Sequence, residues 1–371
     1  MNTVIHRPSL GQRLRPYCSG FDLPLLLGLA LLVSIGCVVL YSALQGQSIA
    51  FSDQLRNLAF GVVVLFVVAQ VPPQRLMQIA VPLYAFGVAL LVATAAFGLV
   101  RKGARRWLDV GVVVQPSEVM KIAMPLMLAW YFQKREGLIR LRDYAIAGLL
   151  LAVPVGLIMK QPDLGTAMLV LSTGFFVIFF AGLSWRVLLA GALAAAAAAP
   201  VLWHFMHAYQ RQRILMLLDP QADPLGTGFN ILQSMIAIGS GGVWGQGYLH
   251  GTQAHLNFVP EAHTDFVFSV LAEEWGLAGN VFLLLSYLFF IGRGLYIASQ
   301  APTLFSRLLA ASITMIFFTY AFVNMGMVSG ILPVVGVPLP FVSYGGTALA
   351  TLMLGTAILL SIARSRRLVQ S

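Results

Sequence analysis

The most regular feature of the sequence is a series of long apolar blocks separated by short polar segments. A typical block has about 20 residues, the length that a helix needs to cross the hydrocarbon core of a membrane. The blocks are continuous rather than alternating, which is typical of transmembrane helices and not of a transmembrane β-barrel. We predict an all-α polytopic membrane protein of one domain, residues 1–371, with about ten spans at 23–44, 55–71, 77–99, 117–132, 144–160, 165–183, 186–203, 266–291, 305–328 and 344–363.

Composition and charge set the orientation of these spans. Only 10% of the residues are charged, against about 25% in an average soluble protein. The net charge of +10 would suggest nucleic acid as a partner of a soluble protein, but here it fits the positive-inside bias of membrane proteins. The side that holds both termini carries 14 basic and three acidic residues, and the other side nine basic and ten acidic ones. We expect cytoplasmic termini, a retained first span and no nucleic-acid partner.

Two segments on the predicted outer side, 100–116 and 204–264, are longer than connections need to be. The second is too apolar for disorder, and its residues 229–238 fit a helix lying in the outer interface. The glycine-rich run that follows predicts tight turns. A further irregular stretch, 329–346, contains three prolines and must be buried in protein or line a cavity. We expect the two outer segments to form the active-site face.

The ionisable residues within or beside the spans gather toward the outer side, and such residues mark function by default. Glu118 and Lys121 are three positions apart in one predicted helix, so they share a face and can pair. One interpretation is an ion pair that only holds two helices together. The other is that Lys121 neutralises a phosphate while Glu118 orients it.

Two aspartates stand at predicted helix starts, where a carboxylate commonly only caps the helix. Asp163 fits that reading at least as well as a catalytic one. Asp265 follows a long structured loop and shares its side of the membrane with several basic groups. A carboxylate at an apolar interface can have its pKa raised by desolvation and act as a base, so Asp265 is the stronger catalytic candidate.

A cationic cluster precedes the fourth predicted span on the outer side. Four basic residues within six positions would attract anionic headgroups by about 1 kcal/mol per charge. Trp107 follows them and suits the same interface. Binding of a phosphate-bearing lipid explains the cluster best; it consists of Arg101, Lys102, Arg105 and Arg106. His204 and His207 lack nearby ligand partners, so we expect no zinc site, and no phosphate-binding loop for nucleotides is present.

Four motifs follow one another along the chain, at 102–121, 161–166, 237–266 and 340–346. They include Lys-Gly-Ala-Arg-Arg-Trp-Leu-Asp with Gln-Pro-Ser-Glu-Val-Met-Lys, then Gln-Pro-Asp-Leu-Gly-Thr, then Ala-Ile-Gly-Ser-Gly-Gly with Pro-Glu-Ala-His-Thr-Asp-Phe, and Pro-Phe-Val-Ser-Tyr-Gly-Gly. Each motif alone is weak. In this order they resemble the SEDS family (shape, elongation, division and sporulation), in its elongation rather than its division branch.

The resemblance implies a peptidoglycan glycosyltransferase in the bacterial cytoplasmic (inner) membrane that polymerises lipid II into β-1,4-linked glycan at the outer face. It implies a class B penicillin-binding protein and other elongation proteins as partners, besides membrane lipids. The essential carboxylate of the family falls on Asp265, and its intramembrane pair on Glu118 and Lys121. Further substrate contacts are expected at Gln115, Asp163, His263 and Ser343.

In the mechanism that we expect, Asp265 acts as base while Arg105, Arg106 and Lys121 stabilise the pyrophosphate that leaves. No tightly bound cofactor is expected, although Mg²⁺ or Mn²⁺ is a candidate assistant. Two alternatives stay open. A lipid II flippase would typically show inverted repeats and polar groups near the midplane, whereas a scaffold that recruits enzymes would leave the outer carboxylates and cations unexplained.

Overall fold

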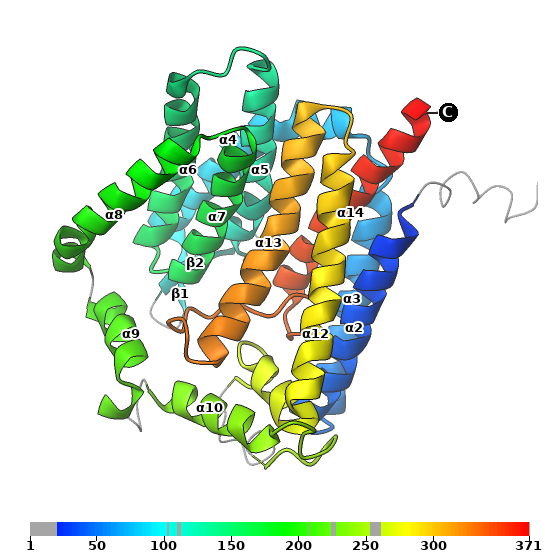
Figure 1. Cartoon of the computed structure of the whole chain (residues 1–371), viewed down its shortest axis with the longest axis vertical. Coiled ribbons are helices and arrows are strands. Elements are labelled where there is room, and N and C mark those ends of the chain that lie inside the picture. The colour runs from blue at the N-terminus through cyan, green and yellow to red at the C-terminus, as the bar shows by residue number, and fades with distance from the viewer. Residues whose placement is uncertain are drawn as a thin grey trace, which may run out of the picture.

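The computed structural model describes residues 21–101, 104–109, 113–206, 208–223, 228–252 and 261–370. Helices form most of these ranges, and the long ones stand side by side in a bundle (Figure 1). They are α2 Leu23–Ala43, α3 Ser48–Val68, α4 Pro73–Phe97, α5 Pro116–Lys134, α6 Leu141–Lys160, α7 Leu164–Phe180, α8 Trp185–Phe205, α9 Ala208–Leu218, η1 Pro220–Ala222, α10 Phe229–Gly241, α12 Val267–Ser299, α13 Leu304–Val328 and α14 Gly346–Gln370.

Each of the ten predicted spans coincides with one long helix, and the predicted all-α class is confirmed. Seven of the described helices are long and apolar enough to cross a membrane. The other three are α5, which carries ionisable side chains, and the apolar helices α7 and α8, whose apolar stretches are shorter. The count of ten spans therefore stays a prediction.

Burial separates central helices from peripheral ones. In α13, 72% of an apolar stretch of 18 residues is buried inside the protein, against 17% of the corresponding stretch in α3. Helix α13 is therefore a central element. Helix α5 is also enclosed, because nearly every side chain from Met120 to Phe132 is buried. Helix α8 is the opposite case: none of its described side chains is buried, and it slants away from the bundle (Figure 1).

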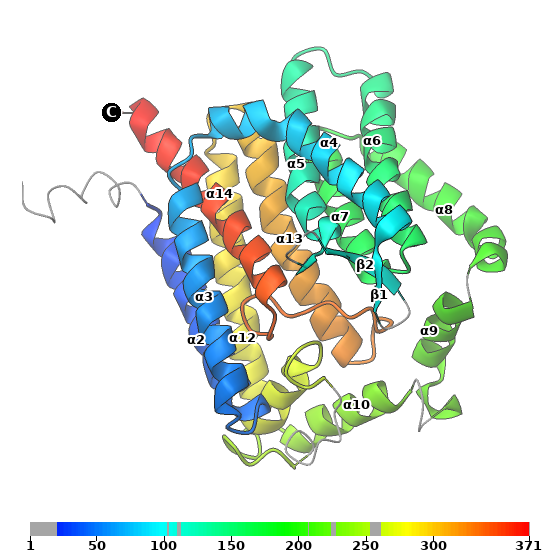
Figure 2. The same ribbon diagram turned by 180° about the vertical axis from the view of Figure 1, so that it is seen from behind.

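Helix α14 closes the back of the bundle, where it lies beside α3 (Figure 2). Gly61 of α3 allows this approach, because a Cβ there would stand 2.9 Å from the Met353 side chain. At the start of α14, Gly346 packs in the same way on Asn57.

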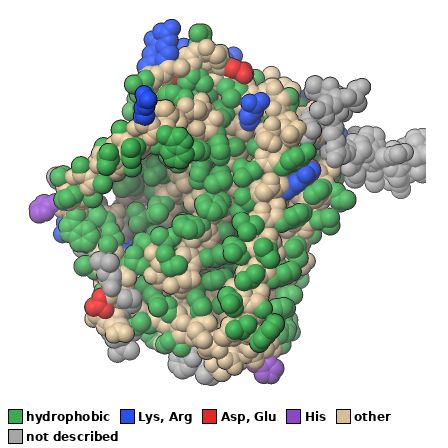
Figure 3. All heavy atoms as spheres, in the orientation of Figure 1, with side chains coloured by type: hydrophobic (Ala, Val, Ile, Leu, Met, Phe, Trp, Pro, Cys, Tyr) green, Lys and Arg blue, Asp and Glu red, His purple; other side chains and the backbone are tan. Residues whose placement is uncertain are grey.

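The connections of the bundle alternate between two ends. The α5–α6 connection and the C-terminus lie at one end, and α10 lies across the other (Figure 1). Most Lys and Arg side chains on the face shown in Figure 3 gather toward the end that holds the C-terminus, and hydrophobic side chains cover the flank between the ends. This distribution agrees with the predicted orientation, in which that end faces the cytoplasm.

The outer segment before α5 forms a small antiparallel sheet, which the helix-based prediction did not include. Its strands are β1 Leu99–Arg101, β2 Ala104–Asp109 and β3 Val113–Val114, in the order β1-β2-β3. Val100 pairs with Arg105 and Leu108 with Val114. The sheet holds β2 against α4 and α5, and so brings the basic segment to the outer end of the bundle.

The predicted span at 266–291 is interrupted. Within α12, Gly276 has φ 63° and ψ −159°, so the residues before and after it form two helical pieces. The glycine-rich run lies against this break. Leu277 and Ala278 donate hydrogen bonds to the carbonyls of Gly242 and Val243, while Gln246 and Gly247 donate to Glu273 and Glu274. These bonds satisfy backbone groups that the break would otherwise leave unpaired.

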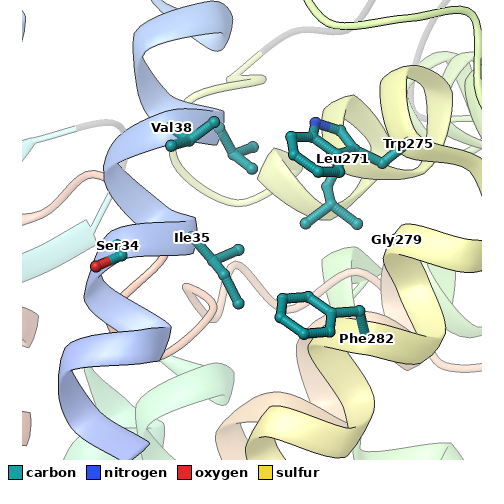
Figure 4. A pocket seen from close by; sticks show the side chains of 8 residues that line it. Ser34, Ile35, Val38, Leu271, Trp275, Gly279 and Phe282 are labelled. Atoms are coloured by element: carbon teal, nitrogen blue, oxygen red, sulfur yellow. The ribbon is translucent and has the colours of Figure 1, made fainter. Parts of the chain in front are cut away.

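An apolar hollow of about 190 Å³ lies beside the break, between α2 and α12 (Figure 4). Ile35 and Val38 of α2 face Trp275 and Phe282 of α12 across it. No ionisable side chain lines this hollow, so it offers no group for acid–base chemistry.

The break predicts that Gly276→Ala destabilises the protein. Its backbone lies in the left-handed region, where a non-glycine residue is strained by about 1–3 kcal/mol, and a Cβ would stand 2.4 Å from the Gly245 nitrogen. We expect a clearly lower midpoint of thermal unfolding in detergent. Gly156→Ala is the control, because that exposed helical glycine has open space around it. An unchanged midpoint for Gly276→Ala would contradict this account of the break.

Candidate active site

The best-defined ionisable cluster surrounds Lys121 near the outer end of α5. Lys121 is only 3% exposed, and its Nζ donates hydrogen bonds to Glu118 Oε1 at 2.6 Å and to Tyr320 Oη at 2.5 Å. The same Nζ lies 5.1 Å from the centroid of the Tyr320 ring. Glu118 Oε2 accepts from the Thr351 hydroxyl at 2.9 Å. The predicted pair is therefore present, and it joins α5 to both α13 and α14.

One turn further along α13, Asn324 contacts the segment that carries Asp265. Its Nδ2 donates to the Asp265 carbonyl at 2.8 Å and to the Val337 carbonyl at 2.7 Å. Tyr320 and Asn324 are four residues apart, so they share a face of α13, about 6 Å apart along the axis. Through α13, the segment of Asp265 and the Lys121 pair come into one region of the protein.

The Asp265 carboxylate lies against the backbone of the irregular stretch before α14. Gly336 has φ 71°, and a Cβ on it would stand 3.2 Å from Asp265 Oδ2, so only glycine fits this contact without strain. The neighbouring His263 accepts a backbone hydrogen bond from Tyr344 at 2.9 Å, and the two rings meet edge to face. Asp265 and His263 are both partly exposed, so they remain accessible to a ligand.

Asp163 is both a helix cap and a member of this region. Its Oδ1 accepts from the Thr166 amide at 3.2 Å, which confirms the predicted cap of α7. Its Oδ2 accepts from Gln115 Nε2 at 3.3 Å and lies 3.8 Å from Arg106 Nε. The following Gly165 packs on the Val335 carbonyl, so the Asp163 turn and the Asp265 segment approach the same stretch, 335–337.

The structure separates the two described arginine side chains of the cationic cluster. Arg106 of β2 reaches Asp163 and donates to the Pro162 carbonyl, whereas Arg105 is exposed. Successive side chains of a strand point to opposite faces, so the two cannot both face Asp163. Lys102 and the side chain of Arg101 lie outside the described residues, as does His207.

Ser343 is buried, and its hydroxyl accepts from the Leu339 amide at 2.8 Å, so it helps to fold the stretch before α14. Gln54 of α3 supports the same stretch: it donates to the Ser343 carbonyl at 3.5 Å and accepts from the Gly345 amide at 3.3 Å. These bonds satisfy irregular backbone inside the bundle.

Tyr320, Asn324, Thr351 and Gln54 were missed by reasoning from the sequence. They are neutral, whereas the sequence prediction rested on ionisable residues in or beside the spans. Tyr320 and Asn324 also lie in the block from Leu308 to Ala363, which contains no charge at all. The sequence signal that could have identified Tyr320 and Asn324 is their spacing, because two polar residues four positions apart share one face of an apolar helix.

Two further carboxylates, Glu273 and Glu274, are almost completely buried at the break in α12. Thr252 donates to Glu273 at 3.2 Å, and Ser42 of α2 donates to Glu274. These contacts tie the glycine-rich run and α2 to the break, and we assign the two glutamates to that support. Among the described residues, no group of three or more His, Cys, Asp or Glu could hold a metal ion.

The geometry predicts that Lys121→Met lowers the free energy of unfolding by about 3 kcal/mol, because it leaves the Glu118 carboxylate without its buried ammonium partner. Adding Glu118→Gln should recover part of the loss. Thermal unfolding in detergent measures both effects.

Arg56→Met is a matched control, because Arg56 and Asp53 form another pair three residues apart that is largely exposed. That variant should change the unfolding midpoint little. A loss for Lys121→Met no larger than the loss for Arg56→Met would contradict the structural importance of the buried pair.

Comparisons with known proteins agree with the geometry. The model of the FtsW/RodA/SpoVE family, described as cell cycle proteins, matches residues 20–368. Peptidoglycan glycosyltransferase MrdB of Escherichia coli K12 is 52% identical, covering 93% of this chain and 94% of its own. Peptidoglycan glycosyltransferase RodA of Treponema pallidum is 32% identical, covering 93% and 98%.

Solved structures give the same answer for the fold. A chain from a peptidoglycan synthase complex that coordinates polymerization and crosslinking matches with a TM-score of 0.82 and 37% identity, covering 94% of this chain and 99% of its own. The rod shape determining protein RodA of Thermus thermophilus matches with a TM-score of 0.72 and 32% identity, covering 95% and 99%. The protein is thus a multi-pass membrane protein, and the chain belongs to the FtsW/RodA/SpoVE family, as the four sequence motifs predicted.

Proposed function

We propose that the chain is a peptidoglycan glycosyltransferase that polymerises lipid II into β-1,4-linked glycan strands during cell elongation. The reaction takes place at the outer face of the bacterial cytoplasmic membrane. The observation that carries this proposal is the convergence of Asp265, the Lys121–Glu118 pair and the Arg106–Asp163 pair on α13 and the stretch 335–337. A carboxylate in the same region as a buried lysine and a half-buried arginine suits transfer of a sugar from a pyrophosphate leaving group.

In the reaction, Asp265 takes the proton from the 4-hydroxyl of the acceptor N-acetylglucosamine. The resulting oxygen attacks the anomeric carbon of the donor N-acetylmuramic acid, and the bond from that carbon to the pyrophosphate oxygen breaks. Undecaprenyl pyrophosphate leaves with the bonding electrons, and inversion at the anomeric carbon gives the β linkage. Because the leaving group is already an activated phosphate ester, no separate strong acid is required.

The cations have distinct tasks in this proposal. Lys121 stabilises the negative charge that develops on the pyrophosphate, and Glu118 and Tyr320 hold its ammonium group in one direction. Arg106 binds the phosphate from the sheet side. Asp163 lies beside its guanidinium, and Gln115 donates a hydrogen bond that holds the Asp163 carboxylate. Arg101, Lys102 and Arg105 attract the anionic headgroup to this face, while the partly exposed His263 borders the acceptor side.

A divalent cation, Mg²⁺ or Mn²⁺, is a candidate assistant in this proposal, because it would neutralise charge on the pyrophosphate. The described residues do not form a closed metal site, so Mg²⁺ or Mn²⁺ would depend chiefly on the pyrophosphate of the substrate for its ligands. The partner that we propose is a class B penicillin-binding protein, which cross-links the strands, together with other elongation proteins. Support comes from the similar chain in a synthase complex that coordinates polymerization and crosslinking.

The proposal predicts that the purified chain, with its transpeptidase partner, converts labelled lipid II into glycan polymer, and that Asp265→Ala lowers the rate at least about 100-fold by removing the base. Asp53→Ala, which removes a partly exposed carboxylate from α3, is the control and should keep the activity. Gel analysis of the polymer measures both. Lipid II that crosses vesicle membranes without polymer would favour a flippase. Neither polymer nor transport would favour a scaffold.

A second prediction separates the two arginines of β2. In the Asp265→Ala background, where turnover is blocked, Arg106→Ala should weaken lipid II binding at least about tenfold, because it loses a charge-assisted hydrogen bond worth about 1.5–3 kcal/mol. Arg105→Ala should weaken it less, because Arg105 is exposed and points away from Asp163. Equal losses in both variants, measured by titration with fluorescent lipid II, would contradict the assigned role of Arg106.

A further inference from the structure

We propose that Asn324 is a positioning residue of the transfer reaction: it fixes the Asp265 segment against the stretch 335–337, at a set distance from Lys121. The inference rests on the proposed function, since it deepens the role given to Asp265. Asn324 is uncharged and lies inside the longest uncharged part of the sequence. It acts through another residue and need not touch the substrate.

The hydrogen bonds identify which atom of the Asn324 side-chain amide contacts the two segments. One atom of the amide approaches two carbonyl oxygens, at 2.8 Å and 2.7 Å, so this atom must be the nitrogen, which alone offers two N–H donors. Asn324 is completely buried, and within the described residues its Oδ1 has no hydrogen-bond partner. Asn324 therefore holds the two segments only through the two N–H donors of its amide.

The two acceptors belong to segments far apart in the sequence. The Asp265 carbonyl is in the segment that enters α12, and the Val337 carbonyl is in the stretch between α13 and α14. Between them, Gly336 lies against Asp265 Oδ2. A single side chain thus holds the backbone of the base and the surface against which its carboxylate rests.

The same face of α13 also fixes the cation. Tyr320, one turn away from Asn324, accepts the hydrogen bond of Lys121 and is likewise completely buried. Because both contacts come from one rigid helix, α13 sets the separation between the carboxylate and the ammonium group. A displacement of about 1 Å at a reacting group can reduce a rate about 100-fold, so the fixed separation has catalytic value.

The test is Asn324→Asp, which keeps the shape of the side chain but replaces both donors by an acceptor facing two carbonyl oxygens. We expect the kcat for glycan polymer to fall at least about 30-fold while the KM for lipid II stays within about threefold. Asn324→Ser keeps one donor without the repulsive charge, and its kcat should lie between those of Asn324→Asp and the unchanged protein. Polymerisation in detergent with the transpeptidase partner gives both constants.

The control is Ser312→Ala on the same helix. Ser312 is also completely buried, and its hydroxyl donates to the Thr173 carbonyl at 2.8 Å, away from the contacts of Asp265. Its loss should lower the unfolding midpoint but leave kcat within about twofold. A merely structural role for Asn324 would instead give activity losses that follow the unfolding midpoints of all three variants.

The outcomes are distinguishable. Folded Asn324→Asp or Asn324→Ser with unchanged kcat would overturn the inference, and so would a raised KM at constant kcat. If Asn324→Asp does not fold, the comparison of Asn324→Ser with Ser312→Ala at equal stability decides in the same way. Absence of polymer from the unchanged protein with its partner would instead count against the proposed function, which the inference assumes.

Discussion

The buried ammonium group of Lys121 is the constraint on which the arrangement of the central helices depends. A charge that is 3% exposed must be paired and hydrogen-bonded, and its two acceptors come from its own helix and from α13. Thr351 then ties the carboxylate of the pair to α14. Satisfying one charge therefore fixes three helices, and the same helices border the region where Asp265 lies.

Among the described residues of the bundle, the break in α12 and the stretch before α14 are both irregular, and hydrogen bonds satisfy the backbone at each of them. At the break in α12, the glycine-rich run supplies the missing backbone partners. In the stretch before α14, the supporting side chains are Asn324, Gln54 and Ser343. Such hydrogen bonds are expected, since unpaired backbone groups inside a membrane are costly. The candidate site lies beside the stretch before α14, where polar side chains are available for ligands as well.

The sequence predicted the helices and the ionisable part of the site, because both follow from strong local signals. Apolar blocks of membrane length marked the helices, and Glu118, Lys121 and Asp265 stood out as charges near the outer side. The break at Gly276 and the sheet at β2 were not predicted. They depend on pairing with distant backbone, which leaves little trace in local pattern. Asn324 escaped for the same reason: its importance lies in two carbonyls that only the fold brings together.

The isolation of α8 has a mechanical consequence. A helix whose described side chains are all at least partly exposed meets lipid around most of its circumference, so protein contacts do little to fix its tilt. Its apolar stretch, Trp185–Val201, is about 26 Å long at 1.5 Å per residue, somewhat shorter than the hydrocarbon layer of about 30 Å. Its tilt then responds to bilayer thickness through hydrophobic mismatch, at a cost of fractions of a kcal/mol per Å. If α8 spans the membrane as the sequence predicts, bilayer thickness therefore bears on the element that leads into α9 and α10.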